Sequence, residues 1–202
     1  ISDKAADMVA ALMKEAKTRG VAVSCDLNFR KKLWSREKAN RVMSSLLDGV
    51  TYLISNEEDC KDVFGIEAKG SSIEGGKLSA DGYAEIGRKV LGMFPSMKAV
   101  AFTLRESYSA GRNGWSAILV TADKVFASKH YDVDIIDRVG GGDSFGAGLI
   151  YGLKNNMGEQ AALEFAVAAS CLKHTVEGDF NVASVAEVKK LAEGDGSGRV
   201  QR

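Results

Sequence analysis

Short strand-like segments alternate with amphipathic helical segments along this chain, and the alternation constrains the fold more than any other feature. Residues 2–19 have apolar side chains at helical spacing and precede a β-branched run at 21–26. The order repeats with a helix capped by Ser35, a strand at 50–54 and a long helix near 81–94. This pattern predicts an α/β fold with a mainly parallel sheet and helices on both faces.

The second half of the chain continues the alternation and ends in helices. Its predicted strands are 98–104, 115–121, 124–128 and 131–136, and its predicted helices are 144–155, 159–173 and 184–193. The step between 121 and 124 predicts a hairpin. Segments 67–80 and 193–202 are polar and Gly-rich, so we expect a surface loop and a frayed tail. No linker divides the chain, and we expect a single α/β domain over residues 1–202.

Composition excludes several classes of function. The 27 Lys and Arg balance the 27 Asp and Glu, which argues against a nucleic-acid or membrane-surface binder. The sequence has no run of about 18 apolar residues, so it predicts no membrane span. The scattered cysteines Cys25, Cys60 and Cys171 predict reduced thiols in a cytoplasmic protein. Only His130 and His174 are histidines, which disfavours a zinc site built on several of them.

Glycine is the unusual residue here, with 22 copies against one proline. The densest cluster begins Asp137-Arg138-Val139-Gly140-Gly141-Gly142-Asp143 and leads into an apolar helix. Successive glycines at a helix N-terminus let backbone N–H groups converge on an anion, which the helix dipole also favours. Asp143 is then either an N-cap or a general base held beside a phosphate. The simpler alternative is a tight turn closed by an Asp cap.

Two familiar glycine patterns do not fit this cluster. A dinucleotide-binding Gly-x-Gly-x-x-Gly that starts at Gly140 would need glycine at 145, where Phe145 stands. A Walker loop needs Gly-Lys-Ser/Thr, and the only Gly-Lys pair, Gly76-Lys77, is followed by Leu78. NAD-linked oxidoreductases and P-loop NTPases therefore lose their main support.

The segment from Asp137 to Asp143 resembles the second signature of the ribokinase-like (PfkB) sugar kinases, Asp-Thr-Val-Gly-Ala-Gly-Asp. Arg138 replaces Thr and Gly141 replaces Ala, as in the 2-keto-3-deoxygluconate kinase branch. Other stretches similar to that branch are Asp26–Arg30 with Leu33-Trp34, Asn56–Asp59, Thr103–Ser107 and Gly194–Arg199. The resemblance covers essentially all 202 residues and implies a ribokinase-like three-layer α/β/α fold with a mainly parallel central sheet.

The resemblance implies ATP-dependent phosphorylation of a primary hydroxyl of a sugar acid, 2-dehydro-3-deoxygluconate to its 6-phosphate. Gly140, Gly141 and Gly142 would form an anion hole for the transferring phosphoryl group, with Gly142 also binding nucleotide. Asp143 would bind the attacking hydroxyl and accept its proton. ATP and Mg²⁺ are the implied cofactors, and a monovalent cation is left open. A ribokinase- or fructokinase-type enzyme is an alternative, because those kinases share the glycine motif.

Two polar stretches match other family motifs. Asn56 would bind nucleotide, and Asp59, in place of the family's Glu, would act on a metal through one water. The alternative is an Asn N-cap followed by acids that the helix dipole favours. Asn28 and Arg30 would bind the sugar acid, and Arg30 would pair with the carboxylate of that substrate. Here the alternative is a solvated cationic loop.

The remaining nucleotide-binding candidates follow a strand and a helix. Arg105, flanked by Thr103 and Ser107, is expected after the strand 98–104, because ligand sites of open α/β sheets lie at the carboxyl ends of strands. A surface hairpin is the alternative. The adenine-binding candidates are His174, Thr175 and Gly178, and the alternative for His174 is a packed or solvated histidine at a helix end.

The chain is shorter than the roughly 300 residues expected for such a kinase. We therefore expect the C-terminal two-thirds of one, without its N-terminal strands, its Gly-Gly sugar signature and its β lid. The intact protein would form a homo-oligomer through that lid. Its partners would be a small sugar acid and ATP, with no nucleic acid and no membrane. The competing hypothesis is a truncated nucleotide-binding remnant without kinase activity.

Overall fold

The computed structural model describes residues 2–68 and 80–194. The chain forms two compact units, one of residues 1–102 and 120–125 and the other of residues 103–119 and 126–202. Strands β3 (Ala99–Ser107) and β4 (Arg112–Thr121) continue from one unit into the other. The expectation of a single domain over residues 1–202 stays a prediction. Most of the predicted loop 67–80 and tail 193–202 lies outside the described residues.

The first unit contains a parallel arrangement of strands with helices between them. Its elements are α1 (Asp3–Thr18), β1 (Ser24–Asp26), α2 (Arg36–Leu47), β2 (Tyr52–Ser55), α3 (Glu57–Phe64) and α4 (Ala80–Met93). Strand β1 pairs in parallel with β2, with Cys25 opposite Leu53, and β2 pairs in parallel with β3, with Leu53 opposite Val100. The predicted α/β alternation and its parallel strands are thus confirmed, although β1 is shorter than the predicted 21–26.

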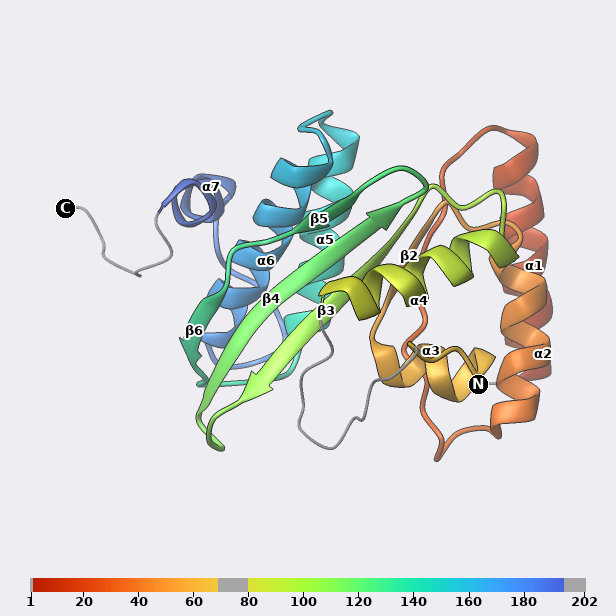
Figure 1. The fold of residues 1–202 in the computed structure, drawn as a ribbon, viewed down its shortest axis with the longest axis horizontal. Coiled ribbons are helices and arrows are strands. Elements are labelled where there is room, and N and C mark those ends of the chain that lie inside the picture. The colour runs from red at the N-terminus through yellow and green to blue at the C-terminus, as the bar shows by residue number, and fades with distance from the viewer. Residues whose placement is uncertain (1, 69–79, 195–202) are drawn as a thin grey trace. The chain divides into compact units, whose positions relative to one another are not determined.

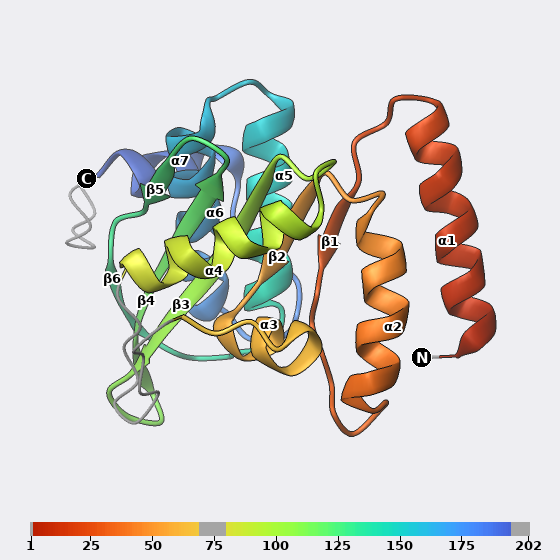
Figure 2. The same ribbon diagram turned by 45° about the vertical axis from the view of Figure 1, so that its right-hand side comes forward.

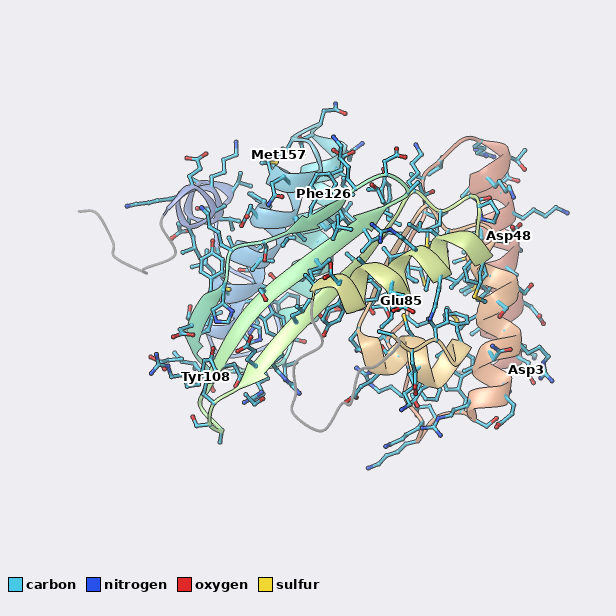
Figure 3. The ribbon with its side chains drawn as sticks, viewed as in Figure 1. Asp3, Asp48, Glu85, Tyr108, Phe126 and Met157 are labelled. Atoms are coloured by element: carbon cyan, nitrogen blue, oxygen red, sulfur yellow. The ribbon has the colours of Figure 1, made fainter. Side chains whose placement is uncertain are left out.

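Helices α1 and α2 run side by side at one edge of this unit (Figure 2). Ser2 and Ser35 cap them, as their sequence positions predict, by accepting the backbone N–H of the third helical residue. Ion pairs join the helix pair near both ends, from Lys38 to Asp3 at 2.8 Å and from Lys17 to Asp48 at 3.3 Å (the two acids are labelled in Figure 3). These pairs are exposed, so each adds little stability.

The second unit places two helices against each other (Figure 1). Its elements are β6 (Tyr131–Asp134), which is antiparallel to β4, and α5 (Gly141–Lys154), α6 (Glu159–His174) and α7 (Val185–Glu193). A Cβ at Gly148 or Gly152 of α5 would lie 2.8 or 2.6 Å from the Cα of Ala166 or Ala162. Small residues therefore let α5 and α6 approach closely, and Ala162 and Ala166 belong to the core.

Strand β5 (Val125–Ala127) follows β4 through a tight turn, in which the Thr121 N–H donates to the Lys124 carbonyl at 2.9 Å. The hairpin predicted at this step is confirmed. A second hairpin joins β3 to β4, where the Tyr108 N–H donates to the Arg112 carbonyl at 3.1 Å. Among the described residues, no helix is long and apolar enough to cross a membrane.

Candidate functional site

The glycine turn, residues 137–143, leads directly into the N-terminus of α5. Gly140 is the N-cap, with φ of 78°, and it provides no side-chain cap. The first bond inside the helix runs from the Ser144 N–H to the Gly140 carbonyl at 2.8 Å, and the Gly141 N–H makes a long 3.4 Å bond to the Arg138 carbonyl. The N–H groups of Gly142 and Asp143 have no partner inside the helix, because the opening positions of a helix lack one.

The three glycines of this turn differ in the space that a larger side chain would have. A Cβ at Gly140 would overlap the backbone oxygen of Asp179, and a Cβ at Gly141 would lie 2.6 Å from Cε1 of His174. A Cβ at Gly142 would meet nothing within 4 Å. Gly140 and Gly141 are therefore required by packing, whereas Gly142 borders open space beside unpaired N–H groups.

Asp143 is the third residue of α5, and its side chain is exposed. Within residues 2–68 and 80–194, no group donates a hydrogen bond to its carboxylate or forms an ion pair with it. The N-cap alternative for Asp143 is wrong, because Gly140 occupies that position. A carboxylate with both oxygens unengaged beside a helix N-terminus can accept a proton from a group bound there.

Asp137 ties the glycine turn to the segment that follows α6. Its Oδ1 accepts the Val139 N–H at 3.0 Å, and its Oδ2 accepts the Gly178 N–H at 2.9 Å. These two bonds lower the pKa of Asp137. The carbonyl of His174 accepts the N–H groups of Ile136 at 2.8 Å and of Asp137 at 3.3 Å. Three hydrogen bonds thus fix the turn and the residue before it to the end of α6, and the bond to Val139 closes the turn itself.

Arg138 fixes the other side of the turn, a role that the sequence analysis missed. Its Nη2 donates to the carbonyl of Ala110 at 2.7 Å and to the side chain of Asn113 at 3.3 Å. The Ile135 N–H adds a bond to the Gly111 carbonyl at 2.7 Å. The β3–β4 hairpin therefore supports the glycine turn. The replacement of the family's Thr by Arg138 was the one available signal, but it did not indicate these partners.

Helix α6 ends at His174, and Thr175 is its C-cap. Both residues were predicted to contact the nucleotide. His174 is buried, with 4% of its surface exposed, and its Nδ1 lies 2.7 Å from the carbonyl of Ser170. Burial lowers the pKa of His174, and the positive charge of Lys173 acts in the same direction. Thr175 donates its hydroxyl to the Leu172 carbonyl at 2.7 Å. The packed-histidine alternative matches this geometry, and the nucleotide contacts of His174, Thr175 and Gly178 stay predictions.

Arg105 does not follow its strand, so that part of the prediction is wrong. Strand β3 continues through Ser107, because the chain turns back there to pair with β4. Arg105 is exposed on the hairpin, Ser107 is exposed and Thr103 is half-buried. The surface-hairpin alternative describes the local structure correctly, and a nucleotide role for these three residues stays a prediction.

In the first unit, Asn56 and Asp59 form a closed helix N-terminus. Asn56 is the N-cap of α3, and its Oδ1 accepts the Asp59 N–H at 2.7 Å. Its Nδ2 donates to Oδ2 of Asp59 at 3.2 Å, so the two side chains satisfy each other. Burial raises the pKa of Asp59 to about 6, opposed by the Phe29 N–H and the charge of Arg30. The predicted N-cap is confirmed.

Asn28 and Arg30 lie on the exposed loop after β1. Asn28 has a φ of 39°, a left-handed conformation that asparagine tolerates better than most residues. Arg30 donates from Nη1 to the carbonyl of Phe29 at 3.0 Å, which leaves its other donors available. Both side chains could therefore bind a ligand, as predicted for a sugar acid.

The carboxylate of Asp59 is the donor type that Mg²⁺ prefers, and Mg²⁺ is commonly held by one or two carboxylates together with substrate phosphates. No cluster of three or more His, Cys, Asp or Glu side chains suited to a metal occurs in the described part of the chain. Asp59 therefore fits a magnesium ion that the nucleotide also ligates, and fits less well a cage built by the protein alone.

The predicted residues thus fall into two groups. The second unit brings the glycine turn together with His174, the segment up to Gly178 and the β3–β4 hairpin. The first unit carries Asn28, Arg30, Asn56 and Asp59.

Three known proteins are similar to this chain over most of its length. A crystal structure of 2-dehydro-3-deoxygluconokinase from Thermotoga maritima is 43% identical, with a TM-score of 0.87, over 94% of this chain and 55% of that one. The 2-dehydro-3-deoxygalactonokinase of Haloferax volcanii is 27% identical over 98% of this chain and 55% of its own length. Ribokinase of Arabidopsis thaliana, solved with ribose and ATP, shares the fold at 20% identity and a TM-score of 0.65, over 94% of this chain and 53% of that one.

The ribokinase-like α/β fold is thereby confirmed. The chain spans about half the length of the relatives it matches, 55% of each of the first two. The family model described as pfkB family carbohydrate kinase matches residues 2–184, which is most of the sequence. The chain therefore belongs to the pfkB family of carbohydrate kinases.

Proposed function

We propose that this chain supplies the nucleotide-binding and phosphoryl-transfer groups of an ATP-dependent sugar-acid kinase. The substrate would be 2-dehydro-3-deoxygluconate, and the product its 6-phosphate. One observation carries the proposal: α5 begins at a glycine cap without a side-chain bond, and the exposed carboxylate of Asp143 beside it has no partner among the described residues.

The chemistry needs few groups from the protein. A transferring phosphoryl group spreads negative charge over its oxygens, and catalysis consists mainly of positioning and electrostatic stabilisation. The N–H groups of Gly142 and Asp143, with the positive end of the α5 dipole, supply such stabilisation. Asp143 accepts the proton of the attacking hydroxyl. Bound Mg²⁺ would neutralise the phosphates, and Asp59 offers the carboxylate type that such an ion takes, directly or through water.

Two observations support a sugar acid as the acceptor. The relatives at 43% and 27% identity are named for 2-dehydro-3-deoxygluconate and 2-dehydro-3-deoxygalactonate, two sugar acids that differ only in configuration. Arg30 has a planar fork that suits a carboxylate, and its described bonds leave donors for one. Asn28, exposed on the same loop, would bind a hydroxyl.

The test is a phosphotransfer assay on the full chain with ATP, Mg²⁺ and each of five acceptors. The acceptors are 2-dehydro-3-deoxygluconate, 2-dehydro-3-deoxygalactonate, 2-dehydro-3-deoxyarabinonate, ribose and fructose. Sugar phosphate formed from the first two supports the proposal. Preference for ribose or fructose would favour the ribokinase- or fructokinase-type alternative. Binding of ATP without any sugar phosphate would favour a nucleotide-binding remnant.

We also infer a cytoplasmic location and a homo-oligomeric intact protein. The location is supported by Cys25, Cys60 and Cys171, all of which are free thiols in the structure. The oligomer is inferred from the resemblance alone. Size-exclusion chromatography with light scattering on the intact protein tests it, and a strictly monomeric mass would refute it.

A further inference from the structure

His174 lies against the first turn of α5. The imidazole is almost fully buried, at 4% exposure, and its Nδ1 lies 2.7 Å from the carbonyl oxygen of Ser170. A carbonyl can only accept, so Nδ1 carries a proton and donates it to Ser170. This bond fixes the ring and directs its other edge away from α6.

The free edge of the ring faces Gly141. A Cβ on residue 141 would lie 2.6 Å from Cε1 and 2.7 Å from Nε2 of His174, closer than real Cβ atoms approach other atoms. Two more contacts hold the pair in place. The Ser170 hydroxyl donates to the Gly141 carbonyl at 2.8 Å, and the Trp115 ring centroid lies 4.7 Å from that of His174. In a close-packed interior the ring has no space to retreat.

The residues directly after Gly141 are the ones whose N–H groups lack partners in the helix. A shift of Gly141 would be transmitted to Gly142 and Asp143, because they belong to the same helical turn. Gly142 itself has open space beside it, so the position of this turn is set from the buried side, at Gly141.

We propose that His174 is a positioning residue, which packs on Gly141 and so sets where the N–H groups of Gly142 and Asp143 point. The packing step concerns the fold alone. The consequence for a bound phosphate rests on the proposed function.

The packing step is tested by a double-mutant cycle with Gly141→Ala, His174→Ala and the double variant. Gly141→Ala should lower Tm by about 5 °C or more, since overpacking a core is costly. In the His174→Ala background the same added methyl should lower Tm little or raise it. Gly142→Ala is the matched control, because its Cβ meets open space, and it should not lower Tm. An equal loss of Tm from Gly141→Ala in both backgrounds overturns the proposal.

The positioning step is read from amide ¹H–¹⁵N chemical shifts and from ATP affinity by calorimetry. Each single variant should move the amide signals of Gly142 and Asp143 and weaken ATP binding by about tenfold, and the double variant should recover most of that affinity. Gly92→Ala, on an exposed and open position of α4, should change neither. Single variants that lose Tm but keep wild-type amide shifts and ATP affinity would show a purely structural histidine and overturn the positioning role.

These readouts separate the inference from the proposed function. If the wild-type chain binds no ATP, the proposed function fails, while the cycle in Tm and the amide shifts still judge His174. If ATP binds but neither single variant weakens it, the proposed function stands and the positioning role fails.

Discussion

Helices α3 and α5 both have an aspartate as their third residue, yet they treat it in opposite ways. On α3 the cap is Asn56, and Asp59 is 7% exposed and bonded to that cap through backbone and side chain. On α5 the cap is Gly140, which offers no side chain, and Asp143 is exposed without a described partner. One residue, the cap, separates a helix end that satisfies itself from one that is left open.

The comparison shows how the same acid is engaged by its own helix cap in one place and left unengaged in another. A side-chain cap satisfies one of the orphan N–H groups that would otherwise bind an anion, as Asn56 does for the Asp59 N–H. Glycine at the cap keeps them free and lets the backbone take a positive φ. The open end of α5 is therefore the better candidate for phosphate binding.

The largest expected effect comes from removing the free acid of the open end. Asp143→Asn should lower turnover by about 10²–10⁴-fold, because a general base contributes that much. ATP affinity should change little, because the N–H groups remain. Steady-state kcat and calorimetric Kd for ATP measure the two effects. Asp123→Asn, at an exposed position of the β4–β5 turn, is the control and should keep full turnover. Near-full activity of Asp143→Asn would show that another group takes the proton.

The next effect concerns the cap glycine. Gly140→Ala should cost about 2–4 kcal/mol of unfolding free energy, because it adds backbone strain to an overlap with the Asp179 backbone. Gly65→Ala, after α3, has a similar φ of 66° but open space, so only the strain of about 1–2 kcal/mol applies. Urea unfolding measures both variants. Equal losses would mean that the contact with Asp179 contributes nothing.

Opening the closed end should have a smaller effect. Asn56→Ala removes the acceptor for the Asp59 N–H and should cost about 1 kcal/mol, whereas Asn56→Gly should cost only a few tenths. Urea unfolding of the two variants provides the measurement. If the alanine variant were as stable as the wild type, the bonds between Asn56 and Asp59 would not stabilise α3.

The sequence predicted caps and glycines better than it predicted contacts. Ser2, Ser35 and Asn56 were identifiable because a cap and its partner lie three residues apart. The glycine turn was identifiable from composition, yet the predicted start of its helix at 144 is wrong, because Gly141 and Gly142 already belong to α5. Glycine has a low helix propensity, so a prediction from sequence starts the helix after the glycines. Tertiary contacts of the turn override that low propensity.

Contacts between distant residues could not be predicted from the sequence. Gly141 and His174 lie 33 positions apart (174 − 141), and nothing in either segment indicates that they touch. Arg105 was misplaced for a related reason, because the extension of β3 depends on pairing with β4. Arg138 was identified only as a departure from a motif, and its bonds to Ala110 and Asn113 come from the fold.

The smallest expected effect is the change that His174 makes in the free energy of unfolding as pH falls. The pKa of His174 lies below its ordinary value of 6.5, because burial and the charges of Lys173, Arg138 and Arg105 disfavour the imidazolium. The bond to the Ser170 carbonyl and the C-terminal end of α6 oppose part of this effect, because both favour the imidazolium. Between the native pKa and 6.5 the unfolded chain binds more protons than the native one, so the free energy of unfolding should fall as pH drops through that window.

Asp59, whose pKa burial raises to about 6, binds protons more readily in the native chain and acts in the opposite direction over part of this range. The contribution of His174 is therefore the difference between wild type and variant in urea unfolding from about pH 8 to about pH 5. His174→Gln should reduce the slope of this profile, since glutamine does not titrate. An unchanged slope in His174→Gln would assign the acid sensitivity to other groups. A flattened one would show that the open end of α5 rests on a ring whose protonation lowers the free energy of unfolding.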